Sequence, residues 1–398
     1  MFKLIKSDKF DSLAEKLLYC SYFVYQFMFL LHVSALAHNV ALYDKLTSIV
    51  IILSFGVILL IDFYYLLRGN YTLNEIIIYG IVGTLLLISL LNYRDVMVSV
   101  NLFAIMAFKN DDAKKGLKIY FIATIIGMIC VMLLGIITPY TGNVIQTRYG
   151  VERIRYGLGF FYTSFALHYL FSLVLVFLII CDKVKLFHYF LIAIINVVLF
   201  LLTDTKAPFL YIWLILIIYL ILTKIKSEFL VRFYGILTVL SYPVLSLFTI
   251  IASYCYNPQS SLSVLLDKVL TGRLYLTHNA LERCKFTLFG QTVDIWGEGF
   301  YIDSSIINML VLNGLMILIV SVLFMTIFSY FSAKNKNIPL MIALSFFALR
   351  SAFDWGFMAF QMTPIVIMFY SEFKSFSDKY SFANNFNFNI SDNKKGEL

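Results

Sequence analysis

Long apolar segments alternate with short polar ones along most of the chain. A helix needs about 20 apolar residues to cross the hydrocarbon core of a bilayer, and about a dozen segments approach that length. The predicted membrane spans are residues 17–36, 46–67, 74–92, 95–109, 117–138, 159–181, 186–203, 207–223, 231–254, 304–330, 338–353 and 355–371. The segments 95–109 and 338–371 fit the pattern less well, because they are short or interrupted by charged residues.

Composition supports the same class of protein. Of the 398 residues, 61% are hydrophobic and 14% are charged, whereas a soluble domain is typically about 45–50% apolar and about 25% charged. The apolar runs are continuous, unlike the alternating strands of a membrane β-barrel. We therefore expect an all-α polytopic integral membrane protein, with residues 1–374 forming one transmembrane bundle of about 12 helices. Residues 375–398 are rich in Asn, Ser, Lys and Asp and are expected to be a disordered cytoplasmic tail.

The distribution of Lys and Arg predicts the orientation. Cytoplasmic segments carry an excess of these residues, and an inside N-terminus places 20 of the 31 Lys and Arg in cytoplasmic segments. An even number of spans then brings the C-terminus into the cytoplasm as well. Most of the net charge of +8 is explained by the excess of Lys and Arg in cytoplasmic segments. The positive charge is spread over many short loops, which argues against a nucleic-acid partner.

The two longest polar stretches, residues 139–158 and 255–303, are then outer loops. In the second, between the ninth and tenth predicted spans, apolar residues recur at helical spacing and predict an amphipathic helix. They are Leu262, Leu265, Leu266, Val269 and Leu270. Gly272 is expected to end this helix, and a second helix is expected from Arg273 to Cys284. The amphipathic helix would lie along the membrane surface or pack on the bundle.

Seven of the 11 basic residues outside the cytoplasmic segments lie in these two loops, against the positive-inside rule. They are Arg148, Arg153, Arg155, Lys268, Arg273, Arg283 and Lys285. Arg forms bidentate, charge-assisted hydrogen bonds to phosphate and stays charged at any working pH. A phosphate ligand therefore explains its presence there. The alternative is ordinary solvated charge, paired with Glu152, Asp267 or Glu282.

Short motifs in these regions occur in a regular order. Arg155-Tyr-Gly-Leu-Gly-Phe160 opens a span, Leu270-Thr-Gly-Arg273-Leu is followed by Leu288-Phe-Gly290, and Asp303-Ser-Ser-Ile-Ile leads to Gly314. This series resembles the Arg-x-x-Leu-Gly-Phe, the Gly-Arg…Leu-Phe-Gly and the Asp-Asn-x-Tyr…Gly patterns of the Wzy-type polysaccharide polymerases, which are related in layout to the O-antigen ligases. Thr203-Asp-Thr-Lys206 lies where that family often has Thr-x-Ser-Arg.

The chain also departs from the family pattern. The His-Pro-Asn that often follows Gly-Phe is replaced by Tyr162-Thr-Ser164, Lys206 stands for an expected Arg, and Ser304 stands for an expected Asn. The resemblance covers nearly the whole chain as layout but only about 40 residues as motif.

The resemblance implies a bacterial cell-membrane glycosyltransferase that polymerises undecaprenyl-diphosphate-linked oligosaccharide repeat units on the outer side of the membrane. It implies a flippase that delivers the repeat units, and a chain-length regulator is a further candidate partner. The leaving group is a lipid diphosphate, so the reaction needs positive charge on that diphosphate and a base near the attacking hydroxyl. The alternatives are an O-antigen-ligase-like transferase and a transporter or flippase for lipid-linked oligosaccharide, although no inverted repeat typical of transporters is evident.

Candidate residues follow from that chemistry. Arg155 and Arg273 are the first candidates to bind the diphosphate; Arg148, Arg153, Lys206, Arg283 and Arg350 are expected to bind substrate. His278 is the candidate base because it titrates near neutrality and lies five residues after Arg273. Asp303 is the alternative base.

Each candidate also has a simpler structural interpretation. His278 would bond Glu282 four residues later on one helix face, Asp303 would lie at the membrane interface before the next span, and Arg350 would pair with Asp354 on one face of a helix. No cofactor or metal is expected, since Asp294, Glu298 and Asp303 fit no standard cation loop. Cys255 and Cys284 are both outside, so a disulfide between them is conceivable.

The orientation can be tested with reporter tags. Tags inserted near residues 150 and 275 should be reached by an impermeant reagent on intact cells, because both loops are expected outside. A tag near residue 114, in a predicted cytoplasmic segment, should be reached only after permeabilisation. The reverse labelling pattern would overturn the orientation and the outer-face chemistry together.

Overall fold

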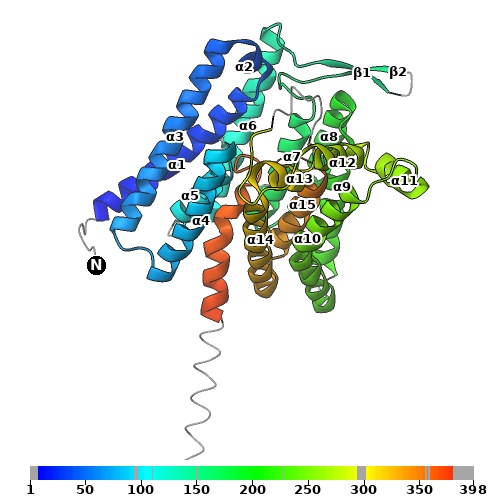
Figure 1. Cartoon of the computed structure of the whole chain (residues 1–398). Coiled ribbons are helices and arrows are strands. Elements are labelled where there is room, and N and C mark those ends of the chain that lie inside the picture. Colours follow the sequence, from blue (N-terminus) through cyan, green and yellow to red (C-terminus); the bar gives the residue numbers. More distant parts are fainter. Residues whose placement is uncertain are drawn as a thin grey trace, which may run out of the picture.

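The computed structural model describes residues 8–93, 97–109, 111–148, 151–225, 227–293, 302–354, 356 and 359–379. Over these residues the protein is a bundle of helices with a small two-stranded sheet at one end (Figure 1). Seven of the described helices are long and apolar enough to cross a membrane. The sequence-based prediction of an all-α membrane protein is therefore confirmed at this level.

The helices of the bundle itself fall within or overlap the predicted apolar segments. The seven long apolar ones are α3 (Ala41–Leu67), α4 (Leu73–Tyr93), α6 (Ala113–Ile137), α8 (Leu186–Thr203), α9 (Lys206–Lys224), α10 (Glu228–Tyr254) and α14 (Leu315–Asn335). The others in the bundle are α1 (Asp8–His32), α2 (Ala35–Asn39), α5 (Met97–Ala107), α7 (Phe165–Ile180) and α15 (Ile338–Phe353).

We call the two ends of the bundle the hairpin face and the opposite face. The hairpin face carries the strands β1 (Val144–Arg148) and β2 (Val151–Arg155) and the short helices α11 (Ser261–Val269), α12 (Arg273–Arg283) and α13 (Ser305–Asn308) (Figure 1). The start of α1 lies at the opposite face, where Asp11 pairs with Arg68 just beyond α3 and Glu15 pairs with Lys115 of α6.

Burial differs sharply between helices. α7 is almost entirely enclosed: 13 of its 16 residues are buried, and Phe171 makes edge-to-face contact with Phe347 of α15 at 5.5 Å between ring centroids. On α4 the buried residues are Leu86 and Ser89. α7 is therefore a central helix of the bundle, whereas α4 presents most of its apolar side chains outward, as expected of a helix facing lipid.

The stretch 139–158 contains an antiparallel β-hairpin that the hydrophobic pattern did not predict. Its register runs from Val144 opposite Arg155 to Arg148 opposite Val151. An isolated two-stranded hairpin is only marginally stable, and this one is fixed at its base, where the Tyr156 N–H donates to the Leu202 carbonyl at 2.9 Å. The hairpin therefore depends on its contact with the end of α8.

The segment predicted as a final span, residues 355–371, is not one continuous helix. Among its described residues, Gly356 has a φ of 112°, and Pro364–Met368 form a short 3-10 helix, η2. A proline lacks the N–H that a regular helix needs, which is consistent with the break. Helical backbone continues over residues 369–379, into the stretch expected to be a tail, and residues 380–398 lie outside the described part.

Both helices predicted in the long polar stretch are present, as α11 and α12. Gly272 separates them in the left-handed region with a φ of 86°, as its sequence position predicts. α11 has no buried residue, and its apolar face is open, with Leu262 64% and Val269 70% exposed. Cys255 and Cys284 are both free thiols.

α13 continues into a π-helical turn, η1 (Met309–Asn313), all of whose residues are buried. The carbonyls of this wide turn accept hydrogen bonds from outside it. Leu312 O accepts from the Gln291 N–H at 3.0 Å, and Asn313 O accepts from Ser89 Oγ of α4 at 3.0 Å. η1 therefore connects the polar stretch after α12 to α4.

Gly159 allows the chain that follows the hairpin to pack closely on α6. Its φ is +82°, and a Cβ there would overlap the carbonyl oxygen of Val131. We expect Gly159→Ala to lower the thermal stability of the detergent-solubilised protein by about 1–3 kcal/mol, through strain and displacement of the chain between the hairpin and α7. Gly80→Ala on α4 is the matched control, because nothing lies within 4 Å of the added Cβ. Equal melting temperatures for the two variants would contradict this packing.

Candidate functional site

Arg273 is the centre of a charged cluster at the hairpin face. It is the first residue of α12, directly after the left-handed Gly272. Its Nη2 donates to Oδ1 of Asp354 at 2.6 Å, and its Nε lies 3.7 Å from Oδ2 of Asp303. One guanidinium thus joins the start of α12 to the residue after α15 and to the residue before the α13 cap.

Asp354 is the buried acid of this cluster. It is 4% exposed, and its backbone carbonyl accepts hydrogen bonds from both the N–H and the hydroxyl of Ser305. Burial raises the pKa of Asp354 to about 6, although the positive charges of Arg273 and Arg350 oppose the shift. A carboxyl group with such a pKa exchanges protons near neutral pH.

Arg350 lies one helical turn before Asp354 and is 2% exposed. Its guanidinium carbon is 5.6 Å from the centre of the Phe171 ring, and its Nη2 is 3.0 Å from Sδ of Met362. A Cβ on Gly356 would come within 2.8 Å of that Nη2, so the chain after α15 covers Arg350 closely. The charge of Arg350 acts on the Asp354 pKa, and the Asp354 N–H donates to the Arg350 carbonyl at 2.7 Å; the pairing of the two side chains stays a prediction.

We call Arg273, Asp303, Arg350 and Asp354 the two-arginine cluster. The charges of Arg350 and Arg273 also act on two further polar side chains, His168 of α7 and Tyr211 of α9. The cluster ranges from the fully buried Arg350 to Asp303, whose side chain is 46% exposed. It therefore leads from the surface of the hairpin face into the bundle.

The arrangement is suited to an anionic ligand. Arg273 bonds the buried carboxylate of Asp354, the charge of Arg350 also acts on it, and Arg is the residue best matched to phosphate oxygens. Asp303 is partly exposed beside Arg273 and can accept a proton from a hydroxyl group bound there. Within the described residues no group of three His, Cys, Asp or Glu side chains is arranged to hold a metal ion.

His278 lies on α12 one turn after Arg273. Its Nδ1 is 2.9 Å from the carbonyl oxygen of Ser253, and its Nε2 is 3.3 Å from Oε1 of Glu282. Carbonyl and carboxylate oxygens only accept, so each contact is a hydrogen bond where the ring nitrogen that faces it carries a proton. The predicted bond to Glu282 is present, and both ring nitrogens have a protein partner.

A second basic group lies where the hairpin meets the turn between α8 and α9. Arg155 donates through Nε to the Thr203 carbonyl at 2.8 Å and through Nη2 to Thr205 Oγ1 at 3.0 Å. Arg153, with a 59% exposed side chain, lies 3.7 Å from Asp204. Lys206 is exposed at the start of α9. The motif residues of this region thus come together and hold the hairpin on the turn.

The remaining predicted substrate-binding residues are less closely placed. Arg148 ends β1, with its backbone opposite Val151, and its side chain lies outside the described part. Arg283 is exposed at the end of α12, ten residues from Arg273. The structure therefore brings Arg273, Asp303 and Arg350 into one cluster and gathers Arg153, Arg155 and Lys206 at another place.

Two residues of the site had been assigned a smaller role, or none, from the sequence. Asp354 is predicted from the sequence only as a helical partner of Arg350, and no role is assigned to His168 in the sequence analysis. The sequence signal that could have identified Asp354 as a site residue was its position four residues after Arg350 at the end of an apolar helix, where charge is costly and often functional. Nothing in the sequence indicated that Arg273, 81 residues away, bonds the same carboxylate.

Asp354→Asn tests the cluster directly. It leaves two guanidinium groups without their shared buried carboxylate, so we expect it to cost about 3–5 kcal/mol of stability in detergent. Asp303→Asn is the matched control: its carboxylate is 46% exposed and 3.7 Å from the same arginine, and its loss should cost at most about 1 kcal/mol. The check is thermal unfolding of the purified variants, and similar losses would show that Asp354 is not the anchor.

Comparison with protein-family models, with curated proteins and with solved structures finds no match for this chain. The chemistry of the site therefore rests on its own residues and on the short motifs noted in the sequence.

Proposed function

We propose that the protein is a membrane glycosyltransferase of the Wzy polymerase type, which joins lipid-diphosphate-linked oligosaccharide repeat units on the outer side of a bacterial cell membrane. The observation that carries the proposal is the two-arginine cluster, in which Arg273 bonds the buried Asp354 and Arg350 lies one helical turn before it at the end of α15. Arg273 and Asp303 both belong to the motifs that resemble the family. The motif resemblance, which suggests the substrate, and the cluster, which suggests the site, therefore share these two residues.

The proposed topology has about 12 spans, with the hairpin face outside and both ends of the chain in the cytoplasm. Contacts at the opposite face support it. Asp11 of α1 pairs with Arg68 there, and Glu372 in the last helical segment accepts from Asn335 at the end of α14 at 2.8 Å. The first and last described helical segments thus reach the same face, as an even number of spans requires.

In the proposed reaction the acceptor is a sugar hydroxyl of a new repeat unit. Its oxygen bonds to the anomeric carbon of the growing chain, the bond from that carbon to the diphosphate oxygen breaks, and the lipid diphosphate leaves with the electron pair. Arg273 and Arg350 stabilise the negative charge on the departing diphosphate. Asp303 takes the hydroxyl proton, and it is better placed than His278, whose ring nitrogens bond Ser253 and Glu282.

Asp354 would position the arginines in this scheme. In the ligand-free arrangement it holds Arg273 by a 2.6 Å hydrogen bond. A bound diphosphate would compete for the same guanidinium, and a carboxyl group with a pKa of about 6 can accept a proton near neutral pH as that contact weakens. The second basic group, around Arg155, would act by keeping the hairpin over the α8–α9 turn.

Deletion of the gene tests the reaction class. Gel analysis of surface polysaccharide should then show single lipid-linked repeat units. Full-length polymer stranded on its carrier would instead indicate a ligase, and absence of lipid-linked material outside would indicate a flippase. Normal surface polymer would overturn the proposed function.

Restoring the gene with Arg273→Ala or Arg155→Ala should leave the deletion phenotype while the protein still inserts. Loss of one such donor in the transition state costs roughly 2–4 kcal/mol, a rate loss of about 30- to 1,000-fold. Arg155→Ala is expected to act through its hydrogen bonds to Thr203 and Thr205. Arg232→Ala is the control, because Arg232 is exposed on α10 and pairs with Glu228 one turn away. Normal polymer in both test variants would remove the site assignment.

A further inference from the structure

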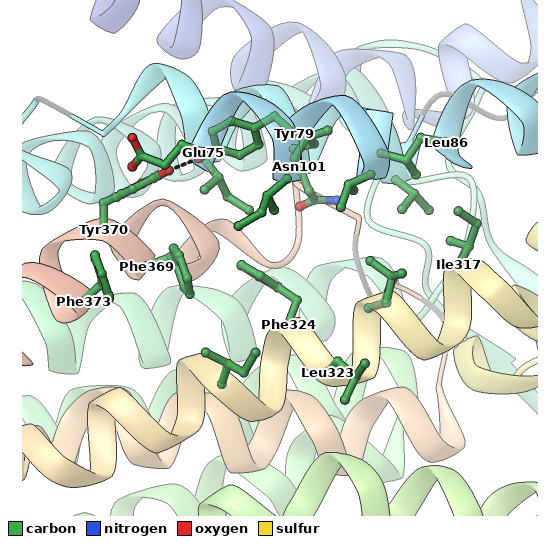
Figure 2. Close-up of a pocket in the computed structure, with 18 of the residues that line it drawn as sticks. Glu75, Tyr79, Leu86, Asn101, Ile317, Leu323, Phe324, Phe369, Tyr370 and Phe373 are labelled. Atoms are coloured by element: carbon green, nitrogen blue, oxygen red, sulfur yellow. Dashed lines mark hydrogen bonds between the residues drawn. The ribbon is translucent and has the colours of Figure 1, made fainter. Parts of the chain in front are cut away.

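A narrow apolar groove runs between α4 and α14. Its volume is about 440 Å³, and Figure 2 shows Phe324 and Leu323 of α14 on one side and Tyr79 and Leu86 of α4 on the other. α5 contributes Asn101, and the last helical segment contributes Phe369, Tyr370 and Phe373. Four separate elements thus form one apolar groove at the depth of the proposed membrane.

The groove exists because α4 packs weakly on α14. Only Leu86 and Ser89 of α4 are buried among the described side chains of that helix, and Ile78, which lines the groove, is 58% exposed. An empty apolar groove forfeits dispersion contacts along its walls. Water is a poor occupant, because apolar cavities without several polar partners stay dry. A hydrocarbon chain that enters from the bilayer restores the dispersion contacts and needs no polar partner.

The groove is closed by polar groups at the opposite face. Lys109 donates to Oε2 of Glu75 at 2.6 Å and to the Asn70 carbonyl at 2.8 Å, and its ammonium lies 4.8 Å from the centre of the Tyr71 ring. The hydroxyls of Tyr79 and Tyr370 bond each other beside this pair. Because Lys109 has these partners, this end is neutral, and an anionic headgroup is better accommodated at the other end.

The length of the groove selects among hydrocarbon chains. On α14 its lining extends from Ile317 to Phe331, which is about 21 Å at 1.5 Å per residue. One leaflet contributes about 15 Å, half of the ~30 Å hydrocarbon thickness. A groove longer than one leaflet favours a chain that extends past the bilayer midplane over a phospholipid acyl chain that ends there.

The groove also approaches the two-arginine cluster from its hairpin-face end. Ser305 of α13 donates to the carbonyl of Asp354 at 2.6 Å, and α13 continues directly into η1, whose Asn313 bonds Ser89 of α4. Ile317, at the upper end of the groove, follows four residues later. One continuous segment thus touches both the cluster and the wall of the groove.

We propose that the α4–α14 groove holds the long isoprenoid chain of the lipid-linked substrate while its diphosphate lies at the two-arginine cluster. The proposal rests on the proposed function, since the isoprenoid diphosphate is the substrate class assumed there. It adds that α4 and α14 form the side opening through which the carrier lipid enters from the bilayer.

The first test is photocrosslinking in cells. A benzophenone amino acid at Val320, which lines the groove, should give an adduct with isoprenoid diphosphate lipid by mass spectrometry. The same group at Ile319, the adjacent residue that is 42% exposed and not part of the lining, should give phospholipid adducts. Phospholipid adducts alone at Val320 would overturn the proposal.

The second test fills the groove. Val320→Trp should lower polymer yield at least about tenfold, equivalent to about 1.4 kcal/mol, whereas Ile319→Trp should leave it unchanged. Normal polymer from Val320→Trp, with the gene deletion still abolishing polymer, would overturn the groove but leave the proposed function intact. Normal polymer in the deletion strain itself would overturn the proposed function instead.

Discussion

The bond between Arg273 and Asp354 is the interaction on which the hairpin face depends. A buried carboxylate is costly unless its charge is compensated, and here Arg273 bonds it directly while Arg350 lies one turn below. The requirement to satisfy Asp354 fixes the start of α12 against the end of α15. Ser305 then attaches α13 to the Asp354 carbonyl, so the long polar stretch and the chain directly after it both meet the end of α15 at one residue.

Much of the bundle could be predicted from the hydrophobic pattern, because lipid imposes a simple condition on every helix that crosses it. α3 and α10 contain predicted spans, α6 and α14 overlap them, and α11 and α12 follow from the spacing of Leu262 to Leu270 and from Gly272. The hairpin β1–β2 was missed because its stability comes from distant partners such as Leu202 rather than from its own sequence. The irregular chain around Pro364 was missed because its apolar residues suit a buried coil as well as a span.

The candidate site was predictable only in part. Arg273 and Asp303 were identified from motif resemblance, and the structure places them 3.7 Å apart. The contact between Arg273 and Asp354 joins residues that are 81 positions apart, and no local pattern encodes such a distance. Arg155 shows the converse: a residue chosen for its charge also has a clear structural task, since its hydrogen bonds fix the hairpin to the α8–α9 turn. One charged side chain in a loop can therefore have a proposed functional role and a structural role at the same time.

The π-helical turn η1 has a mechanical consequence. Because its carbonyls bond outward, to Gln291 and to Ser89, the turn is tied at once to the surface chain after α12 and to a helix that faces lipid. A sideways displacement of α4 would pull on Asn313 and, through the same turn, on the residues around Gly290. A movement of α4 and a movement of the surface chain after α12 are thereby mechanically coupled through the single π-helical turn η1.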